Sequence, residues 1–234
     1  MKNEELNIVY EDNHIIVVIK PQNVPSQEDS SKDKDMLSMV KDYIKEKYNK
    51  PGEAFVGLVH RLDRPTGGLM VFAKTSKAAS RLADQMQNGE LSKEYLAVLV
   101  GKPKYDRDRL VHFLKKDELN NIVKVVPQYE TGAKRAELHY NILDFNEKLS
   151  LARIKLFTGR SHQIRVQMST IKVPVFGDVK YHGDIVKGYN LALWAYKLIF
   201  VHPITKQIMN FISYPPESET PWNYFNLDKV LKDM

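Results

Sequence analysis

Many short stretches of the chain alternate apolar and polar residues with a period of two, which is the pattern of half-buried β-strands. The predicted strands cover residues 8–10, 15–20, 55–59, 69–74, 93–100, 110–115, 122–126, 134–143, 149–157, 193–201 and 207–212. Asp12-Asn13 separates the first two strands and predicts a hairpin turn there.

Helical periodicity is less frequent. An apolar stripe from Met36 to Ile44 predicts a helix that ends before Pro51-Gly52. A second helix is expected from a cap at Ser76 to Asn88-Gly89, and a third is expected after a cap at Ser161, with Ile164 and Met168 on its buried side. Many strands with few helices predict an α+β fold built on a mostly antiparallel sheet.

Composition narrows the class of protein. The 234 residues include 43% hydrophobic and 27% charged residues and no cysteine, which argues against a disordered chain, a membrane bundle, a disulfide framework and thiolate catalysis. No linker divides the sequence, so a single domain over residues 1–234 is expected. The acidic N-terminus lacks the pattern of a signal peptide, and no apolar run approaches the roughly 18 residues of a membrane span. A soluble cytoplasmic protein is therefore expected.

Positive charge is concentrated in one part of the chain. The total is 35 basic against 29 acidic residues, a net charge of +6. The stretch from Lys148 to Gly177 holds six basic residues and no acidic one. The stretch is either a solvated face that lacks acids by chance or a surface for phosphates, and the composition favours a polyanionic partner.

The densest candidate for chemistry is His60-Arg61-Leu62-Asp63-Arg64-Pro65-Thr66-Gly67-Gly68, between two predicted strands. Asp63 stands between two arginines, and a nearby guanidinium group favours an ionised carboxylate. The loop either presents this carboxylate for a reaction or contains an ordinary surface salt bridge.

A second candidate is the stretch from Thr158 to Gln167. His162 and Arg165 are three residues apart on the predicted helix, so they share one face, beside Arg160 at the helix start. That face is either solvated or a contact for a phosphate or carboxylate group. Tyr95, on a predicted strand, would ordinarily be a core residue.

Several common motifs are absent from the sequence. The seven histidines show no HExxH and no paired metal-ligand spacing, and neither a P-loop nor a G-x-G-x-x-G is present. The sequence thus supports neither a bound metal nor a nucleotide cofactor.

Taken together, HRLDRPTGGLMVFAKTSKAA, SKEYLAVLVG and TGRSHQIRVQM resemble the motifs of RluA-type pseudouridine synthases. The opening IVYEDNHIIVVIKPQNVP and the ending LALWAYKLIFVHPITKQIMNF are similar to the same family, so the resemblance extends from about residue 8 to residue 216. It implies the pseudouridine synthase fold, a bent, mixed, mostly antiparallel sheet with flanking helices and a central basic cleft. It also implies conversion of uridine in RNA to pseudouridine without a cofactor.

The resemblance assigns roles to individual residues. Asp63 matches the catalytic aspartate, which either attacks the sugar or assists formation of a glycal. Tyr95 matches the tyrosine that packs on the uracil, and Arg165 matches the basic residue that pairs with the aspartate. The RNA contacts predicted around this site are Arg61, Arg64, Arg160 and His162.

Two positions depart from the family pattern, Gly67 where serine is common and Trp194 where many relatives have histidine. The N-terminal RNA-binding domain of the S4 type that many relatives carry is not expected here. The loops 27–34 and 102–116 of the catalytic domain are therefore expected to select the target RNA. The expected partner is a structured ribosomal or transfer RNA. The protein is expected to be a monomer and not to bind a membrane.

Two other functions are consistent with parts of this pattern. One is a catalytically idle RNA-binding protein on the same fold, against which the intact Asp63, Tyr95 and Arg165 argue. The other is a metal-dependent nuclease, which would need clustered carboxylates where the motif supplies only Asp63.

Overall fold

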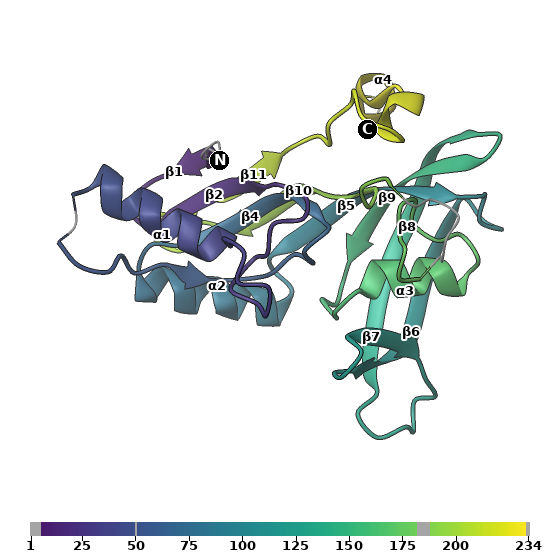
Figure 1. The fold of residues 1–234 in the computed structure, drawn as a ribbon, viewed down its shortest axis with the longest axis horizontal. Helices are drawn as coiled ribbons and strands as arrows, with labels where there is room; N and C mark the ends of the chain where they lie inside the picture. The colour runs from purple at the N-terminus through teal and green to yellow at the C-terminus, as the bar shows by residue number, and fades with distance from the viewer. Residues whose placement is uncertain (1–5, 50, 182–187, 233–234) are drawn as a thin grey trace. The chain divides into compact units, whose positions relative to one another are not determined.

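The structure is a computed structural model that describes residues 6–49, 51–181 and 188–232. The chain divides into two compact units (Figure 1). Unit 1 contains Met1–Lys93 and Ala195–Ser213, and unit 2 contains Glu94–Trp194 and Tyr214–Met234.

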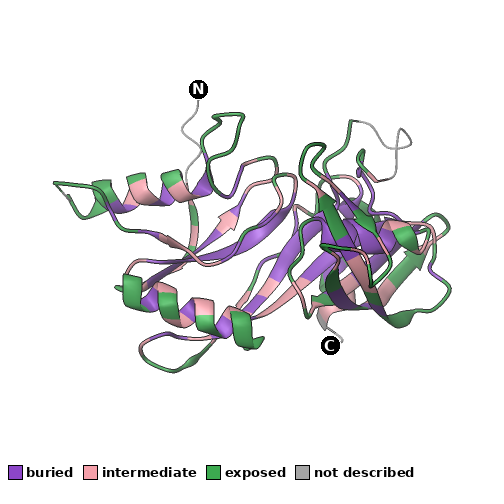
Figure 2. Cartoon of the chain, turned by 90° about the horizontal axis from the view of Figure 1, so that it is seen from below, coloured by how far each residue is buried: buried purple, intermediate pink, exposed green. Residues whose placement is uncertain are grey.

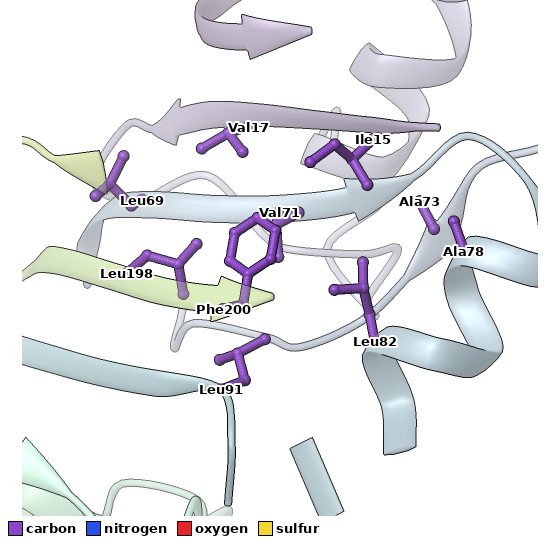
Figure 3. Packing of buried hydrophobic residues seen from close by; sticks show 10 residues of the cluster. All are labelled: Ile15, Val17, Leu69, Val71, Ala73, Ala78, Leu82, Leu91, Leu198 and Phe200. Carbon is purple, nitrogen blue, oxygen red and sulfur yellow. The ribbon is translucent and has the colours of Figure 1, made fainter. Parts of the chain in front are cut away.

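Unit 1 is a mixed, mostly antiparallel sheet with a helix on each side. Strands β1 (Asn7–Glu11), β2 (Ile15–Lys20) and β4 (Gly67–Ala73) are adjacent in that order, and β10 (Leu193–Val201, in this unit from Ala195 on) follows. The short β3 (Gly57–Leu58) pairs with β4, and β11 (Ile208–Ile212) pairs with β10. Helices α1 (Met36–Lys47) and α2 (Ser76–Asn88) lie on opposite sides of these strands (Figure 2). Within the sheet, β4 and β10 run in the same direction (Figure 3).

The core of unit 1 follows from the alternation of side chains along β2 and β4. Ile15, Val17 and Val71 point to the face that α2 covers with Ala78 and Leu82 (Figure 3). The intervening residues, Ile16, Val18, Met70 and Phe72, are also fully buried, so both faces of these central strands are covered.

Gly68 at the start of β4 has a structural reason to be glycine. Its φ is +115°, and a Cβ atom placed there would lie 2.3 Å from the carbonyl oxygen of Ala195. Glycine therefore lets the Asp63 loop enter the sheet directly against β10.

Unit 2 is a second antiparallel arrangement, with strand order β5 (Ser92–Val100), β9 (Leu149–Leu156), β8 (Lys134–Asn146), β6 (Arg107–Asp117) and β7 (Ile122–Val125). Helix α3 (Gln163–Thr170) packs on one face of it, where Val166 meets Leu114, Val123 and Ala136. A 3-10 turn, η2 (Trp222–Tyr224), and helix α4 (Leu227–Lys232) follow near the C-terminus.

The predicted α+β class and mostly antiparallel sheet are confirmed, although Phe55, Val56 and Val59 of the predicted strand 55–59 lie outside β3. Two predicted caps are wrong. Thr75, and not Ser76, caps α2, because its Oγ1 accepts a hydrogen bond from the Ala78 N–H at 3.2 Å. At α3 the N-cap is His162, and not Ser161.

No helix among the described residues is long and apolar enough to cross a membrane. The single-domain organisation and the central basic cleft stay predictions.

Candidate active site

The Asp63 loop, residues 60–66, connects β3 to β4 in unit 1. Its turn is closed by a hydrogen bond from the Thr66 N–H to the Asp63 carbonyl at 2.9 Å. Leu62 is buried before Asp63 and Thr66 is buried after it, while Asp63 itself is partly exposed. The loop is therefore fixed on both sides of Asp63, which is itself partly exposed.

Lys20 ties this loop to the end of β2. Its fully buried Nζ donates to the carbonyl oxygens of Pro21, Val24 and Arg64 at 2.9, 2.6 and 2.9 Å. Burial lowers the pKa of Lys20 to about 7, and the charge of Asp63 opposes that shift. The three carbonyl acceptors use all three N–H bonds of an ammonium group, so the protonated form fits this site.

Ser26 holds the residue directly before Asp63. Its Oγ donates to the Leu62 carbonyl at 2.7 Å and accepts from the Leu62 N–H at 3.1 Å. Ser26 is buried, so its hydroxyl takes the place of water for both backbone groups of Leu62.

His60 is the buried base of the same loop. Its Nε2 accepts a hydrogen bond from the Val71 N–H at 3.2 Å, which requires an unprotonated nitrogen there. Burial lowers the pKa of His60 to about 3. His60 is therefore a neutral structural residue at physiological pH.

The two arginines beside Asp63 have different surroundings. Arg61 is exposed. Arg64 forms ion pairs with Asp33 and, at 3.6 Å, with Asp29, and its Nη1 donates to Ser31 at 2.8 Å. Arg64 therefore anchors the 27–34 loop to the Asp63 loop.

In unit 2, Arg165 on α3 forms a bidentate ion pair. Its Nε and Nη2 each donate to a different carboxylate oxygen of Asp178, both at 2.7 Å. Both residues are buried, and Asp178 also accepts from the backbone N–H groups of Lys180 and Tyr181 at 3.0 and 3.2 Å. The pair fixes the plane of the Arg165 guanidinium group.

His162 and Arg165 meet at Tyr181, as expected for two residues on one side of α3. His162 Nδ1 lies 2.7 Å from the Tyr181 hydroxyl, and the Arg165 guanidinium carbon lies 5.1 Å from the centre of the Tyr181 ring. This side of the helix is buried, so its interpretation as a solvated face is wrong.

The start of α3 explains why Ser161 is not its cap. Gln163 Oε1 accepts from the Arg160 N–H at 3.0 Å and from the Thr158 hydroxyl at 2.8 Å, while its Nε2 donates to the Glu137 carbonyl at 3.0 Å. The Gln163 side chain therefore organises this turn, and His162 adopts the left-handed conformation (φ 51°) before it. Arg160 is exposed, and its Nε donates to the Arg135 carbonyl at 3.0 Å.

Tyr95 on β5 is buried in unit 2, with 5% of its surface exposed. Lys93 lies two residues earlier on the same strand, and burial lowers its pKa to about 8. Asp63 belongs to unit 1, whereas Tyr95, His162 and Arg165 belong to unit 2. The pairing of Asp63 with Arg165 therefore stays a prediction.

Sequence reasoning missed four residues that shape these two regions, namely Lys20, Ser26, Asp178 and Tyr181. A signal existed for Lys20, since it ends the apolar run of β2, where a buried lysine needs partners. Among the described residues, no group of three or more histidine, aspartate or glutamate side chains could hold a metal ion.

Comparison with known proteins identifies the family of the chain. The sequence profile described as RNA pseudouridylate synthase matches residues 14–170. The ribosomal large subunit pseudouridine synthase D of Vibrio parahaemolyticus is 33% identical over 231 residues, with 91% of this chain and 68% of that protein covered. The mitochondrial tRNA pseudouridine(32) synthase of Saccharomyces cerevisiae is 34% identical over 191 residues, with 80% of this chain and 39% of that protein covered.

Solved structures show the same fold. The human RNA pseudouridylate synthase domain containing 4 has a TM-score of 0.77 at 21% identity, covering 96% of this chain and 93% of that one. Fold and sequence together define an isomerase that acts on uridine in RNA. The chain belongs to the RNA pseudouridylate synthase family, and the RluA-type resemblance of its motifs is confirmed.

Proposed function

We propose that the chain converts uridine in ribosomal or transfer RNA to pseudouridine through the carboxylate of Asp63. In this isomerisation the N1–C1′ bond of uridine breaks, the uracil turns, and a C5–C1′ bond forms. The C5 proton leaves and N1 gains a proton, so atoms and electrons balance within the nucleotide and water.

The observation that carries the proposal is the support around Asp63. The partly exposed Asp63 stands on a turn whose neighbouring residues, Leu62 and Arg64, are held by the buried Ser26 and Lys20. A carboxylate held in place can stabilise positive charge that develops at C1′, or attack that carbon directly. Both routes require the ionised form of Asp63.

Tyr95 and Arg165 complete the proposed catalytic set. For Tyr95 we propose packing on the uracil and acceptance of the C5 proton. For Arg165 we propose a pairing with Asp63, and the bidentate bond to Asp178 supports it by fixing the direction of the guanidinium group.

For the RNA contacts, the exposure of Arg61 and Arg160 supports roles at phosphates. Arg64 is also exposed and is part of the proposal, although its ion pairs with Asp29 and Asp33 favour the anchoring of the 27–34 loop. His162 is buried against Tyr181, which favours a role in orienting that tyrosine over a direct contact. The proposed substrate class is supported by the relatives, whose names specify the ribosomal large subunit and tRNA. A monomer acting in the cytoplasm without a cofactor is part of the same proposal.

The test is chemical mapping of pseudouridine in total RNA of the host, with the gene intact, deleted, and restored as Asp63→Asn. We expect at least one uridine position in ribosomal or transfer RNA to lose its signal on deletion, and Asp63→Asn not to restore it. Full restoration by Asp63→Asn would refute the role of this carboxylate and favour an idle RNA-binding protein, with the modification made by another enzyme.

A further inference from the structure

A cluster of charged and aromatic side chains lies in unit 2 on β6, on β8 and at the end of β9, with Phe157 directly after that strand. Figure 1 shows these strands. Side chains alternate across these strands, and the even-numbered Leu114 and Ala136 face α3. The odd-numbered residues therefore face away from α3. We call this set the Glu137 cluster, which consists of Arg109, Arg135, Glu137, His139, Lys155 and Phe157.

Glu137 is the centre of the cluster. Its side chain is 11% exposed and accepts from Arg109 Nε at 2.7 Å and from Arg135 Nη2 at 2.6 Å. These two hydrogen bonds lower the pKa of Glu137, so it stays ionised. The arginine side chains are themselves 58% and 47% exposed, so one buried carboxylate holds two guanidinium groups at the surface.

Phe157 supplies an exposed ring beside these charges. It is 48% exposed, although burial of an aromatic side chain is favourable. The His139 ring lies 4.4 Å from it between ring centres, and Lys155 Nζ lies 5.5 Å from its centre. The ring is thereby supported on one side by an imidazole and is flanked by a cation.

The charge of the cluster is positive overall. Arg109, Arg135 and Lys155 supply three positive charges against the single negative charge of Glu137, and Arg160 is attached through its bond to the Arg135 carbonyl. An exposed aromatic ring with a cation beside it, in a cluster that carries further exposed arginines, has the elements of a platform for a nucleic acid strand, in which phosphates contact the cations and a base stacks on the ring.

We propose that the Glu137 cluster is a second RNA-docking surface, on which Arg109 and Arg135 contact phosphates and Phe157 stacks an unpaired base. It lies on the face of the sheet opposite α3 and contains none of the residues assigned to catalysis. This inference rests on one part of the proposed function, namely that the substrate is RNA. It does not depend on the role of Asp63. An acidic protein surface would pair with the arginines but gives no reason for the exposed Phe157 ring beside Lys155.

The test measures the dissociation constant of the full chain for a fluorescent oligouridylate and for an unmodified ribosomal RNA transcript, over a range of salt concentrations. Phe157→Leu is expected to weaken binding about tenfold, because it keeps an apolar side chain but removes the π face. Phe157→Trp is expected to retain binding. Arg109→Gln is expected to weaken binding and to reduce the slope of log affinity against log salt by about 0.7 to 1, the loss of one phosphate contact.

A matched control exists in the same unit. Phe145 is 38% exposed, and Lys102 Nζ lies 5.3 Å from the centre of its ring, but it lies outside the Glu137 cluster. Phe145→Leu is therefore expected to bind RNA like the unaltered chain. Thermal unfolding of each variant shows whether the fold is intact.

The outcomes separate this inference from the proposed function. If Phe157→Leu and Arg109→Gln fold normally and bind both RNAs with unchanged affinity and unchanged salt dependence, the RNA-docking role is refuted. An acidic protein would then be the more suitable partner for this surface. Equal losses in Phe157→Leu and Phe145→Leu would refute it as well. Neither result bears on Asp63, whose role is decided by pseudouridine formation.

Discussion

Arg165 and Asp178 form a buried bidentate ion pair in unit 2, with both nitrogen–oxygen distances at 2.7 Å. The arginine belongs to a motif that the sequence makes conspicuous, whereas its partner stands 13 residues later in a stretch without a periodic pattern. Asp178 thus sets the position of a residue that we assign to the active site, and it is a positioning residue in the proposed reaction.

Asp178→Asn is expected to lower the free energy of unfolding by about 3–5 kcal/mol, because it leaves the Arg165 charge buried without its counter-ion. It is also expected to slow pseudouridine formation under conditions where the protein is still folded. Chemical denaturation and a single-turnover assay measure the two effects. Lys180→Ala is the control, because Lys180 reaches Asp178 through its backbone N–H. An Asp178→Asn variant with unchanged stability and rate would contradict the assigned role.

Ser26→Ala tests the support of the Asp63 loop. The change removes the partner of both backbone groups of Leu62, and leaving such buried groups unpaired costs about 1–3 kcal/mol. We expect a lower unfolding free energy together with slower catalysis at unchanged RNA affinity. Ser30→Ala, on the exposed 27–34 loop, is the comparison. A loss of stability with a fully retained rate would mean that the clamp does not orient Asp63.

Gly68→Ala tests the close approach of the Asp63 loop to β10. The added Cβ would overlap the Ala195 backbone and require a strained φ of +115°, so we expect a loss of about 4 kcal/mol or more. Gly52→Ala, where nothing lies within 4 Å, should change stability by less than about 1 kcal/mol. Thermal or urea unfolding compares the two, and similar midpoints for both variants would be inconsistent with the described packing.

The burial of His60 predicts a dependence of stability on pH. Its pKa is lowered from 6.5 to about 3, so below pH 6.5 the unfolded chain binds a proton that the folded chain does not. The unfolding free energy should therefore fall as the pH decreases from 6.5, with a contribution that approaches about 1.4 kcal/mol per pH unit.

The measurement is urea unfolding between pH 6.5 and 5.5, because Glu11, whose pKa is lowered from 4.5 to about 2, begins to lose its contribution to stability only below about pH 5.5. His60→Gln, whose amide oxygen can still accept from the Val71 N–H, should show a shallower fall than the unaltered chain. His139→Gln controls for the loss of a histidine as such. Parallel pH curves for His60→Gln and the unaltered chain would contradict this assignment.

Much of the fold could be predicted from local pattern. Short apolar runs such as those at 15–20 and 69–74 predict buried strands, and the structure places them in β2 and β4, which are buried on both faces. Local pattern failed where a distant residue decides the structure. The start of α3 depends on the bond from Gln163 to the Glu137 carbonyl, 26 residues away, which nothing near Ser161 indicates.

In the candidate site, too, the residues that local pattern predicts differ from those that distant contacts determine. Its motif residues, Asp63, Tyr95 and Arg165, are visible in the sequence because they stand in recognisable stretches. Their supports, Ser26 and Asp178, are contributed through contacts over 36 and 13 residues, and no spacing rule connects such residues. For Arg64 the flanking position in the sequence suggests a partnership with Asp63, while its ion pairs in the structure are with Asp29 and Asp33.

The central claim is that Asp63 carries the isomerisation, and one measurement with purified protein tests it most directly. Unmodified ribosomal and transfer RNA are incubated with the unaltered chain or with Asp63→Asn, and both pseudouridine formation and RNA binding are measured. We predict that Asp63→Asn binds the RNA with similar affinity and forms pseudouridine at least about a thousandfold more slowly, as expected for loss of a group that acts on the transition state. Pseudouridine formation by Asp63→Asn at the rate of the unaltered chain would contradict the account.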